Sequence, residues 1–397
     1  MKRKNLIFEG DNLSIMKSGL FKKHVRQVDM IYIDPPYNTG NSFSYDDSKS
    51  TEDWNKFIED RLLVSKEYMK DGAPIFISID DSKYANLKLI CDEVFGAENF
   101  VGTFITQQAI RSNAKHINIC HEYILCFTNN IKKLKPFKLK RINIPQDRHM
   151  INDIAEKVKS IFKKDGKEAA EKELKTHIEY YCKERNITWL KNYSNVDENG
   201  DVFFAKDLST PGKPREVDIP EIGLKLSPLQ TRGWSSDAKF ISLHMQKKLV
   251  FKNERPYEKH LLVDSEDNAC SLLNYYSRQG TNDLNKLGLR NLFDTPKPVE
   301  LIKFLIRIGM SDNGVLLDFF AGSGTSAQSI YECNKEDGGN KGYVLIQLNE
   351  EVNKDTKVYD ACKKYGIKPL ISEITVHRIN TYLQKEGMEI DYEVMRG

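Results

Sequence analysis

The sequence predicts an α/β protein with a mixed, mostly parallel, doubly wound sheet that a separate inserted domain interrupts. Two observations lead to this fold class. Near both ends of the chain, short stretches that are apolar on both faces, as in buried parallel strands, alternate with amphipathic helical patterns. The middle of the chain lacks this alternation and has longer polar segments and turn clusters. We therefore expect three segments: residues 1–131, an insert at residues 132–291, and residues 292–397.

The composition is that of a globular protein with no membrane span. Of 397 residues, 40% are apolar and 10% aromatic, which excludes fibrous and wholly disordered classes. The 60 Lys and Arg nearly balance the 57 Asp and Glu, so a nucleic-acid partner would need a local basic patch. Seven irregularly spaced cysteines, without a signal-type apolar stretch at the start, indicate free thiols in a reducing cytoplasm. Charges break every apolar run before it could cross a bilayer.

The first segment contains three expected strands and two expected helices. Residues 29–34 and 73–80 are short, β-branched and apolar, and residues 122–127 provide a third strand. Residues 51–70 place apolar side chains mostly at steps of three and four, which predicts an amphipathic helix. Residues 82–95 repeat the helical pattern. Because strand and helix alternate, this segment is expected to form half of the sheet.

The insert has an uneven charge. Residues 131–185 contain 16 Lys and Arg against 9 Asp and Glu, and no acid interrupts residues 132–141. A polyanion could bind there, although a solvated helical face would have the same composition. The candidate DNA-binding residues are Lys132, Lys133, Lys135, Lys138, Lys140 and Arg141.

The last segment returns to alternating helices and strands. The pattern predicts a helix at residues 298–310, a strand at 315–320, a helix at 325–333 and a strand at 343–348. These elements are expected to form the second half of the sheet.

The sharpest motif is Asp34-Pro35-Pro36-Tyr37, which follows the strand at residues 29–34. The prolines lack N–H groups and hold the chain extended, which fixes a backbone carbonyl and the Asp34 side chain at the carboxyl end of a buried strand. Open α/β sheets bind ligands at this end. Two acceptors beside an aromatic face suit an exocyclic amine on a flat base, which donates two hydrogen bonds while its ring stacks on Tyr37. An ordinary strand-ending turn would use the same residue types.

A second motif, DFFAGSGT at residues 318–325, follows another expected strand and precedes a helix. Small residues let backbone amides approach a ligand, and a helix start offers unpaired N–H groups. The motif lacks the Lys of a phosphate-binding loop and the third glycine of a dinucleotide fingerprint, so neither ATP nor NAD is favoured. An acid followed by Gly-x-Gly suits a cofactor that carries an amino acid, such as S-adenosylmethionine. Gln347, with Glu350 as a second candidate, would then reach the cofactor ribose.

Together, DPPYNTG and DFFAGSGT resemble the signature pair of S-adenosylmethionine-dependent DNA amino-methyltransferases of the β class, in the form usual for adenine N6. More narrowly, IYIDPPYNTGNSFSYDD, HEYILCF and LFDTPKPVELIKFLI look like the modification subunit of type III restriction-modification systems. The likeness is weaker in the insert, where this family places its target-recognition domain. The resemblance implies a Rossmann-like S-adenosylmethionine-dependent methyltransferase fold and double-stranded DNA as substrate. It leaves open a restriction subunit as partner and a homodimer.

The resemblance also assigns roles to matching residues. Asp34 and the carbonyl of Pro35, within the motif that includes Pro36, would accept the two N6 hydrogens of an adenine flipped out of the duplex, and Tyr37 would stack on that base. The residues expected around the cofactor are Asp11, Asp34, Phe293, Thr295, Lys297, Asp318, Phe320, Gly322, Gly324 and Gln347. Gln347 departs from the acidic residue that many methyltransferases have there, so its hydrogen bond would lack charge-assisted strength.

Other sites and functions agree less well with the sequence. The cluster of His116, Cys120, His121 and Cys126 does not have a usual zinc spacing, so no metal is expected. No Cys lies beside the Asp-Pro-Pro-Tyr motif, which argues against a thiol nucleophile that methylates cytosine carbon. The expected function is adenine-N6 methylation of DNA within a restriction-modification system. A cytosine-N4 methyltransferase, an RNA substrate and a catalytically idle DNA-binding specificity subunit remain as alternatives.

Overall fold

The computed structural model describes residues 5–24, 26–38, 50–108 and 116–396. They form two compact units, residues 1–137 with 269–397 and residues 138–268. These boundaries differ from the expected insert at residues 132–291. Residues 269–291 lie in the first unit because strand β16 (Leu272–Tyr276) pairs with strand β4 (Phe100–Gln107) of the large sheet.

The first unit is built on a nine-stranded sheet with the order β16-β4-β5-β3-β2-β17-β18-β1-β19. Strand β5 is antiparallel to its neighbours β3 and β4, and every other pairing between described strands of this sheet is parallel. The strands besides β4 and β16 are β1 (Asn5–Glu9), β2 (Met30–Ile33), β3 (Pro74–Ile79), β5 (His121–Thr128), β17 (Val315–Asp318), β18 (Gly342–Gln347) and β19 (Tyr392–Arg396).

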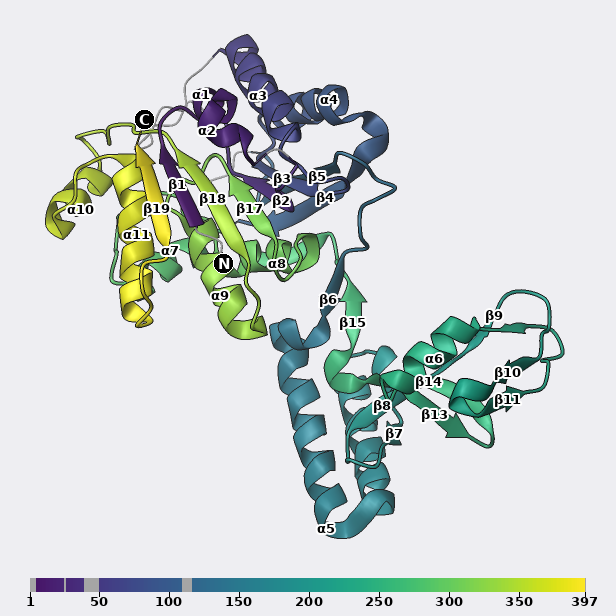
Figure 1. Cartoon of the computed structure of the whole chain (residues 1–397). Helices are drawn as coiled ribbons and strands as arrows, with labels where there is room; N and C mark the ends of the chain where they lie inside the picture. The colour runs from purple at the N-terminus through teal and green to yellow at the C-terminus, as the bar shows by residue number, and fades with distance from the viewer. Residues whose placement is uncertain (1–4, 25, 39–49, 109–115, 397) are drawn as a thin grey trace. The chain divides into compact units, whose positions relative to one another are not determined.

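Helices cover both faces of this sheet (Figure 1). One face carries α1 (Asn12–Lys17), α2 (Gly19–Lys22), α3 (Thr51–Lys66) and α4 (Tyr84–Phe95). Helix α3 begins after Ser50, whose side chain accepts a hydrogen bond from the backbone of Asp53, and it buries Trp54, Ile58 and Leu62. The apolar steps of three and four in the sequence therefore face the sheet.

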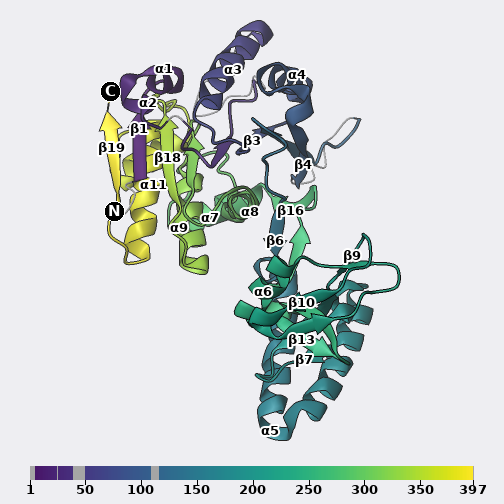
Figure 2. The same cartoon turned by 45° about the vertical axis from the view of Figure 1, so that its right-hand side comes forward.

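The opposite face is covered by helices from the last part of the chain (Figure 2). The ring of Phe304 in α8 lies 5.8 Å from that of Phe104, which in turn lies 6.2 Å from that of Phe76 in β3. The helices from this part of the chain are α7 (Arg278–Lys286), α8 (Val299–Gly309), α9 (Thr325–Asp337), α10 (Lys357–Tyr365) and α11 (Ile371–Lys385). The expected mostly parallel, doubly wound α/β fold is thus confirmed.

The sheet has a topological switch point between β2 and β17. These strands are parallel neighbours, with Met30 opposite Leu316 and Ile31 opposite Leu317. From β2 the chain continues through α3 to β3 on one side, and from β17 it continues through α9 to β18 on the other side. Because the two connections diverge, a crevice is expected at the carboxyl ends of β2 and β17, where open α/β sheets bind ligands.

The second unit combines a bent helix with small antiparallel sheets. Helix α5 (Pro145–Glu184) is interrupted at Gly166, whose φ of 84° lets the chain turn back, and Tyr181 donates to Asp153 at 2.8 Å between the two halves. Helix α6 spans Asp237–Met245. The strands are β6 (Lys138–Lys140), β7 (Asn195–Val196), β8 (Val202–Asp207), β9 (Ser209–Thr210), β10 (Val217–Ile219), β11 (Leu224–Leu226), β12 (Gly233–Trp234), β13 (Leu249–Lys252), β14 (Arg255–Leu261) and β15 (Glu266–Asn268).

Within the described ranges, no helix is both long enough and apolar enough to span a membrane. All seven cysteines are free thiols.

Candidate active site

The two sequence motifs meet at the switch point. Asp34 follows the last residue of β2, and Asp318 is the last residue of the neighbouring strand β17. Since the strands are parallel and in register, both carboxylates lie at the same edge of the sheet. Residues nearly 300 positions apart in the sequence thus form one site.

The Asp-Pro-Pro-Tyr loop is held by hydrogen bonds to its backbone. The indole Nε1 of Trp54 in α3 donates to the carbonyl of Pro36 at 2.7 Å. The hydroxyl of Ser82, just before α4, donates to the carbonyl of Tyr37 at 3.3 Å. Within the loop, the Tyr37 hydroxyl donates to Asp34 Oδ1 at 2.8 Å. These hydrogen bonds hold the loop against α3 and against the turn that precedes α4.

Lys297 lies against this loop. Its Nζ is 3.2 Å from Asp34 Oδ1, and it donates to the Tyr37 hydroxyl at 2.7 Å and to Glu122 Oε2 at 2.9 Å. Its side chain is 13% exposed, that of Glu122 19% and that of Asp34 27%. Lys297 was expected near the cofactor. Its ammonium contacts Asp34 and Tyr37, which were expected to hold the target base, and Glu122. Its carbonyl accepts from the hydroxyl of Thr325, in the glycine-rich loop, at 3.3 Å.

Burial and neighbouring charges act in opposite directions on Asp34. Burial raises the pKa of its carboxyl above the ordinary value, the charge of Lys297 lowers it, and the charge of Glu122 raises it. Burial disfavours the charged form of Lys297, but Asp34 and Glu122 together raise the pKa of its ammonium well above the usual value. The ammonium is therefore fixed as a donor at the pH of a cell.

Asp318 lies deeper than Asp34. It is only 2% exposed, and its oxygens accept hydrogen bonds from the backbone N–H of Phe320 at 3.1 Å and from the Ser326 hydroxyl at 2.6 Å. Burial raises the pKa of this carboxyl to about 7 despite those hydrogen bonds. A buried carboxylate at a ligand edge is suited to a cationic group, whose charge would favour its ionised form.

The glycine-rich loop needs its glycines. Gly322 and Gly324 have φ values of 51° and 81°, which side chains rarely adopt. A Cβ on Gly322 would lie 3.4 Å from the Phe293 ring, and a Cβ on Gly324 would lie 3.2 Å from the Thr375 carbonyl oxygen. Gln347 Oε1 accepts from the Gly322 N–H at 2.7 Å. Gln347 therefore shapes this loop, a role that its position at the strand end does not reveal.

The remaining candidates for the cofactor differ in position. Asp11 caps α1 through the Ser14 N–H at 2.8 Å and pairs with Arg61 at 2.8 Å. Burial opposes its ionisation, but the hydrogen bonds from Ser14 and the charge of Arg61 together lower its pKa. Phe320 is half-buried, with its ring 5.3 Å from that of Phe319, and Thr295 is exposed.

The expected DNA-binding run is divided between the two units. Lys132, Lys133 and Lys135 belong to the first unit, and the rest of the run belongs to the second. All five lysines of the run are exposed, but the Arg141 side chain is only 12% exposed. Its guanidinium pairs with Asp147 at 3.2 Å and Asp267 at 2.7 Å.

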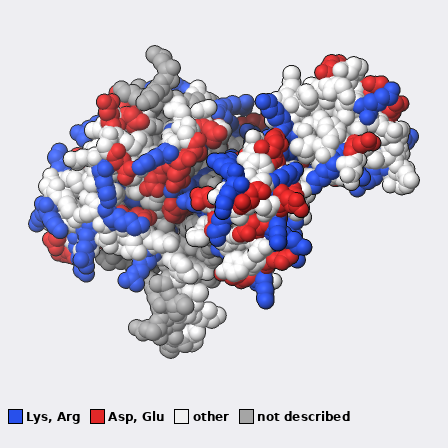
Figure 3. Space-filling view, turned by 90° about the horizontal axis from the view of Figure 1, so that it is seen from below, with Lys and Arg blue, Asp and Glu red and all other residues white. Residues whose placement is uncertain are grey.

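Arg141 therefore differs from the expected phosphate ligand, because two carboxylates already use its charge. On the face shown in Figure 3, basic and acidic side chains are interspersed over each unit.

A cluster of three glutamates, Glu300, Glu332 and Glu336, is the one group among the described residues with metal-ligand geometry. Their oxygens surround the ammonium of Lys303 at 2.6 to 3.0 Å. Their negative charge is thus used within the protein, on a buried lysine.

Two residues near the motifs were not expected from the sequence. Glu122 was assigned only to a strand. Arg378 in α11 is fully buried, and it donates at 2.6 Å to the hydroxyls of Ser323 and Thr325 in the glycine-rich loop. A polar residue at the start of an apolar strand was the only sign of Glu122, and the spacing in the sequence gave no sign of Arg378.

Known proteins match the chain over most of its length. It is 29% identical over 416 residues to the Mod subunit of the type III restriction-modification enzyme EcoP15I of Escherichia coli, which covers 94% of this chain and 62% of that protein. It is 29% identical over 403 residues to the type II methyltransferase M.KpnI of Klebsiella pneumoniae, with 94% and 86% covered. The chain spans less than two thirds of the Mod subunits of EcoP15I and EcoPI.

Among solved structures, the cytosine-N4-specific PvuII DNA methyltransferase matches with a TM-score of 0.44 and 10% identity, over 96% of this chain and 94% of that chain. A family model described as DNA methylase matches residues 28–357, well over half of the chain. The chain therefore belongs to the DNA methylase family.

Proposed function

We propose that this protein transfers a methyl group from S-adenosylmethionine to the N6 amine of adenine in double-stranded DNA. The observation that carries the proposal is the meeting of Asp34 and Asp318 at the carboxyl ends of two neighbouring parallel strands. One motif offers acceptors and an aromatic ring, and the other offers a buried carboxylate beside a glycine-rich loop. Together they suit an amine and a cationic cofactor.

The glycine-rich loop fits S-adenosylmethionine in two respects. Gly322 and Gly324 have positive φ and no side chain, so their backbone stays open to a ligand. A Cβ at these positions would contact Phe293 or Thr375. The buried carboxylate of Asp318 matches the positive charge of the amino-acid part. When bound, the cofactor supplies a methyl group on a sulfonium, which is a good leaving group. Phe293 would border the same end of the cofactor.

The Asp34 loop would orient the target amine. Asp34 and the carbonyl of Pro35 would accept its two hydrogens, and the Tyr37 ring would stack on the flipped base. The nitrogen lone pair would then point at the methyl carbon, since both hydrogens are held in fixed directions. N6 gains a bond to carbon as the carbon–sulfur bond breaks, and it then releases one proton to solvent. No covalent intermediate with the protein is required.

Each unit offers its own candidate contacts to DNA. We propose that the exposed lysines of residues 132–140 contact phosphates and that the second unit reads the target sequence. Because the relatives include modification subunits of type III systems, we also propose a restriction subunit as partner. The reaction would take place in the cytoplasm, where the DNA substrate lies.

The test is base-modification sequencing of DNA from a host that carries the gene and from the same host without it. The proposal expects N6-methyladenine within one recurring sequence, and only in the host with the gene. Methylation of cytosine N4 alone would assign the alternative amine. Identical modification in both hosts would contradict methyltransferase activity on DNA.

A further inference from the structure

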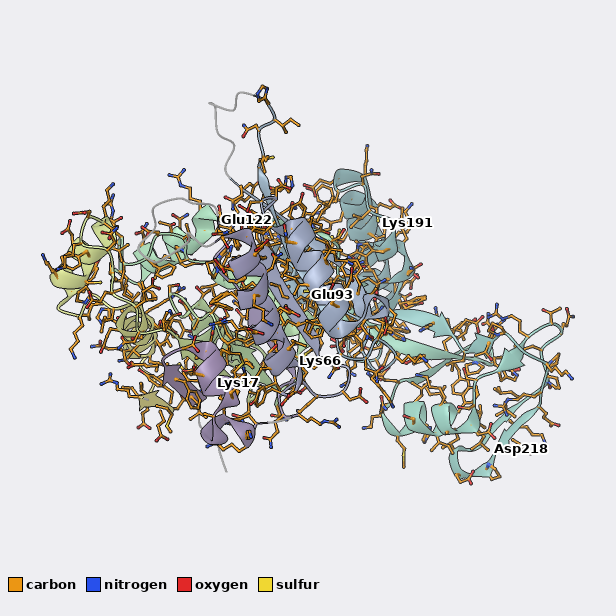
Figure 4. All side chains as sticks on the ribbon, turned by 90° about the horizontal axis from the view of Figure 1, so that it is seen from above. Lys17, Lys66, Glu93, Glu122, Lys191 and Asp218 are labelled. Atoms are coloured by element: carbon orange, nitrogen blue, oxygen red, sulfur yellow. The ribbon has the colours of Figure 1, made fainter. Side chains whose placement is uncertain are left out.

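Among the described strands of the nine-stranded sheet, only β5 is antiparallel to its neighbours, and it brings an additional charge to the site. Strand β5 runs against β3, so its first residues lie at the edge where the parallel strands end. Tyr123 of β5 is paired with Ile79, the last residue of β3. Glu122 therefore lies at the same edge as Asp34, and Figure 4 labels it in the view from above. A parallel strand at this position would have placed Glu122 at the opposite edge.

Both oxygens of Glu122 are held. Oε2 accepts from Lys297 at 2.9 Å, and Oε1 accepts from the side-chain amide of Gln108. The Gln108 oxygen in turn accepts from the Ser277 hydroxyl at 2.8 Å. These contacts join β5, the end of β4, the start of α7 and the segment before α8 into one hydrogen-bonded chain. Glu122 is therefore a fixed charge that holds Lys297 in place.

Lys297 in turn distinguishes the two oxygens of Asp34. Oδ1 accepts from the Tyr37 hydroxyl at 2.8 Å and lies 3.2 Å from the Lys297 ammonium. Among the described residues, no donor contacts Oδ2 within hydrogen-bond distance, and the Asp34 side chain remains 27% exposed. Within the described part of the chain, one oxygen is thus engaged by the protein while the other has no protein donor.

We propose that Lys297 and Glu122 are a pair of positioning residues for amine methylation. Lys297 locks Asp34 and Tyr37 so that Oδ2 faces the target amine, and Glu122 both anchors Lys297 and cancels its charge. This inference rests on the proposed function and deepens it, because it assigns the pair to the base-binding half of the site. It differs from the expectation that Lys297 contacts the cofactor.

The charge balance explains why an anchored pair is needed. Asp34 alone would carry one negative charge beside the amine, and Lys297 alone would neutralise it. When both carboxylates are ionised, Lys297, Asp34 and Glu122 together carry a net charge of −1. The amine nitrogen becomes more positive as its new bond forms, so a net negative site favours the transition state. Lys297 therefore orients Asp34 without removing that advantage.

Three variants and one control test the pair. Lys297→Met removes the ammonium, Lys297→Arg keeps the charge, and Glu122→Gln removes the anchor's charge with little change in size. Glu93→Gln is the matched control, because Glu93 is exposed on α4. We expect single-turnover methylation to fall by about 10-fold to 100-fold in Lys297→Met and Glu122→Gln. Cofactor affinity, measured by calorimetry, should stay within about threefold of the parent.

The pH dependence separates positioning from a merely structural role. The groups that face Asp34 are Lys297, Glu122, Tyr37, Tyr32 and Asp318. Lys297 lowers the pKa of Asp34, so Lys297→Met should move the acid limb of the rate profile to higher pH. Glu122 raises that pKa, so Glu122→Gln should move the limb to lower pH. Lys297→Arg should retain the parent limb.

The outcomes are distinct. A parent protein that methylates no amine contradicts the proposed function itself. An active parent whose Glu122→Gln and Lys297→Met variants keep its rate and acid limb overturns the pair. Loss of cofactor binding in folded Lys297→Met, with the acid limb unchanged in Glu122→Gln, would place Lys297 at the cofactor and also overturn the inference. If Lys297→Met does not fold, Glu122→Gln decides by its acid limb alone.

Discussion

Replacing Asp34 by Asn should abolish most of the methylation, because the site dictates which way the new amide points. The ammonium of Lys297 lies 3.2 Å from Oδ1, where it can donate to an amide oxygen but repels an amide NH2. The Tyr37 hydroxyl donates to the same atom at 2.8 Å, so it also favours an amide oxygen over an amide NH2 at this position. The amide NH2 must therefore take the place of Oδ2. It would then present a donor to an amine that also needs to donate.

The magnitude follows from the loss of one positioned acceptor. Such a loss commonly costs about 10² to 10³ in rate, or about 2.7 to 4 kcal/mol. Stability should change less, since Lys297 keeps its 2.9 Å pair with Glu122 and does not become an unpaired buried charge. Cofactor affinity should also change little, because Asp318 and the glycine-rich loop are unaltered.

The assay is single-turnover methylation of duplex DNA with labelled S-adenosylmethionine, with cofactor binding measured by calorimetry on the same preparation. Asp34→Ala provides a comparison that removes the acceptor without adding a donor, and it should be at least as active as Asp34→Asn. A rate for Asp34→Asn within about threefold of the parent would show that Oδ2 does not accept the amine.

Four other predictions concern the cofactor, DNA binding and the stability of the second unit. Gly324→Val should weaken cofactor binding at least about tenfold, because a φ of 81° and a Cβ 3.2 Å from the Thr375 carbonyl oxygen would strain the loop by about 1 to 3 kcal/mol. Calorimetry on the folded variant measures this affinity, and a normal value would place the cofactor elsewhere. The pKa of Asp318 is about 7, and a bound cation would lower this pKa, so cofactor affinity should rise as pH rises through about 7. Asp318→Asn should lose this pH dependence, and a parent affinity that does not change with pH would contradict the prediction. Neutralising the five lysines of residues 132–140 should reduce the logarithmic salt slope of DNA binding by about 0.9 for each phosphate contact that is lost, and an unchanged slope would make the run a solvated surface. Arg141→Gln should instead lower the free energy of unfolding of the second unit by about 1 to 3 kcal/mol, as measured by chemical unfolding.

The strands and helices nearest the motifs could be predicted because each is buried in a regular way. Residues 29–34 and 315–320 were expected as strands, and β2 and β17 lie within them. The helix expected at residues 51–70 forms as α3 and ends at Lys66. Local periodicity carries this information, since a parallel strand is apolar on both faces and a helix on one.

The edge strands could not be predicted from such patterns. Strand β16 has the sequence LLNYY, but it is only five residues long and leaves Leu272 and Tyr276 exposed, so only its pairing with β4 places it in the sheet. The polar segments and turn clusters that surround it in the sequence led to the expectation that the insert continues to residue 291. Similarly, the two halves of α5 were expected only as a charged segment or a solvated helical face, because the turn at Gly166 divides the apolar pattern of the helix.

In the candidate site, the sequence motifs pointed to Asp34 and Asp318 but not to the side chains that contact them. Asp34 and Asp318 each follow a recognisable strand, so their common position follows from the expected sheet. Glu122 and Lys297 reach Asp34 through a strand reversal and a connection that follows α7, neither of which leaves a local pattern. Long-range polar contacts of this kind depend on topology, which spacing alone does not determine.

The central claim is tested most directly by nucleoside mass spectrometry of unmethylated duplex DNA after incubation with the purified protein and methyl-labelled S-adenosylmethionine. The parent should label N6-methyldeoxyadenosine, and Asp34→Asn, with cofactor affinity retained, should lower that label by about 10² or more. Label found in N4-methyldeoxycytidine, or label in N6-methyldeoxyadenosine that Asp34→Asn leaves unchanged, would contradict the account.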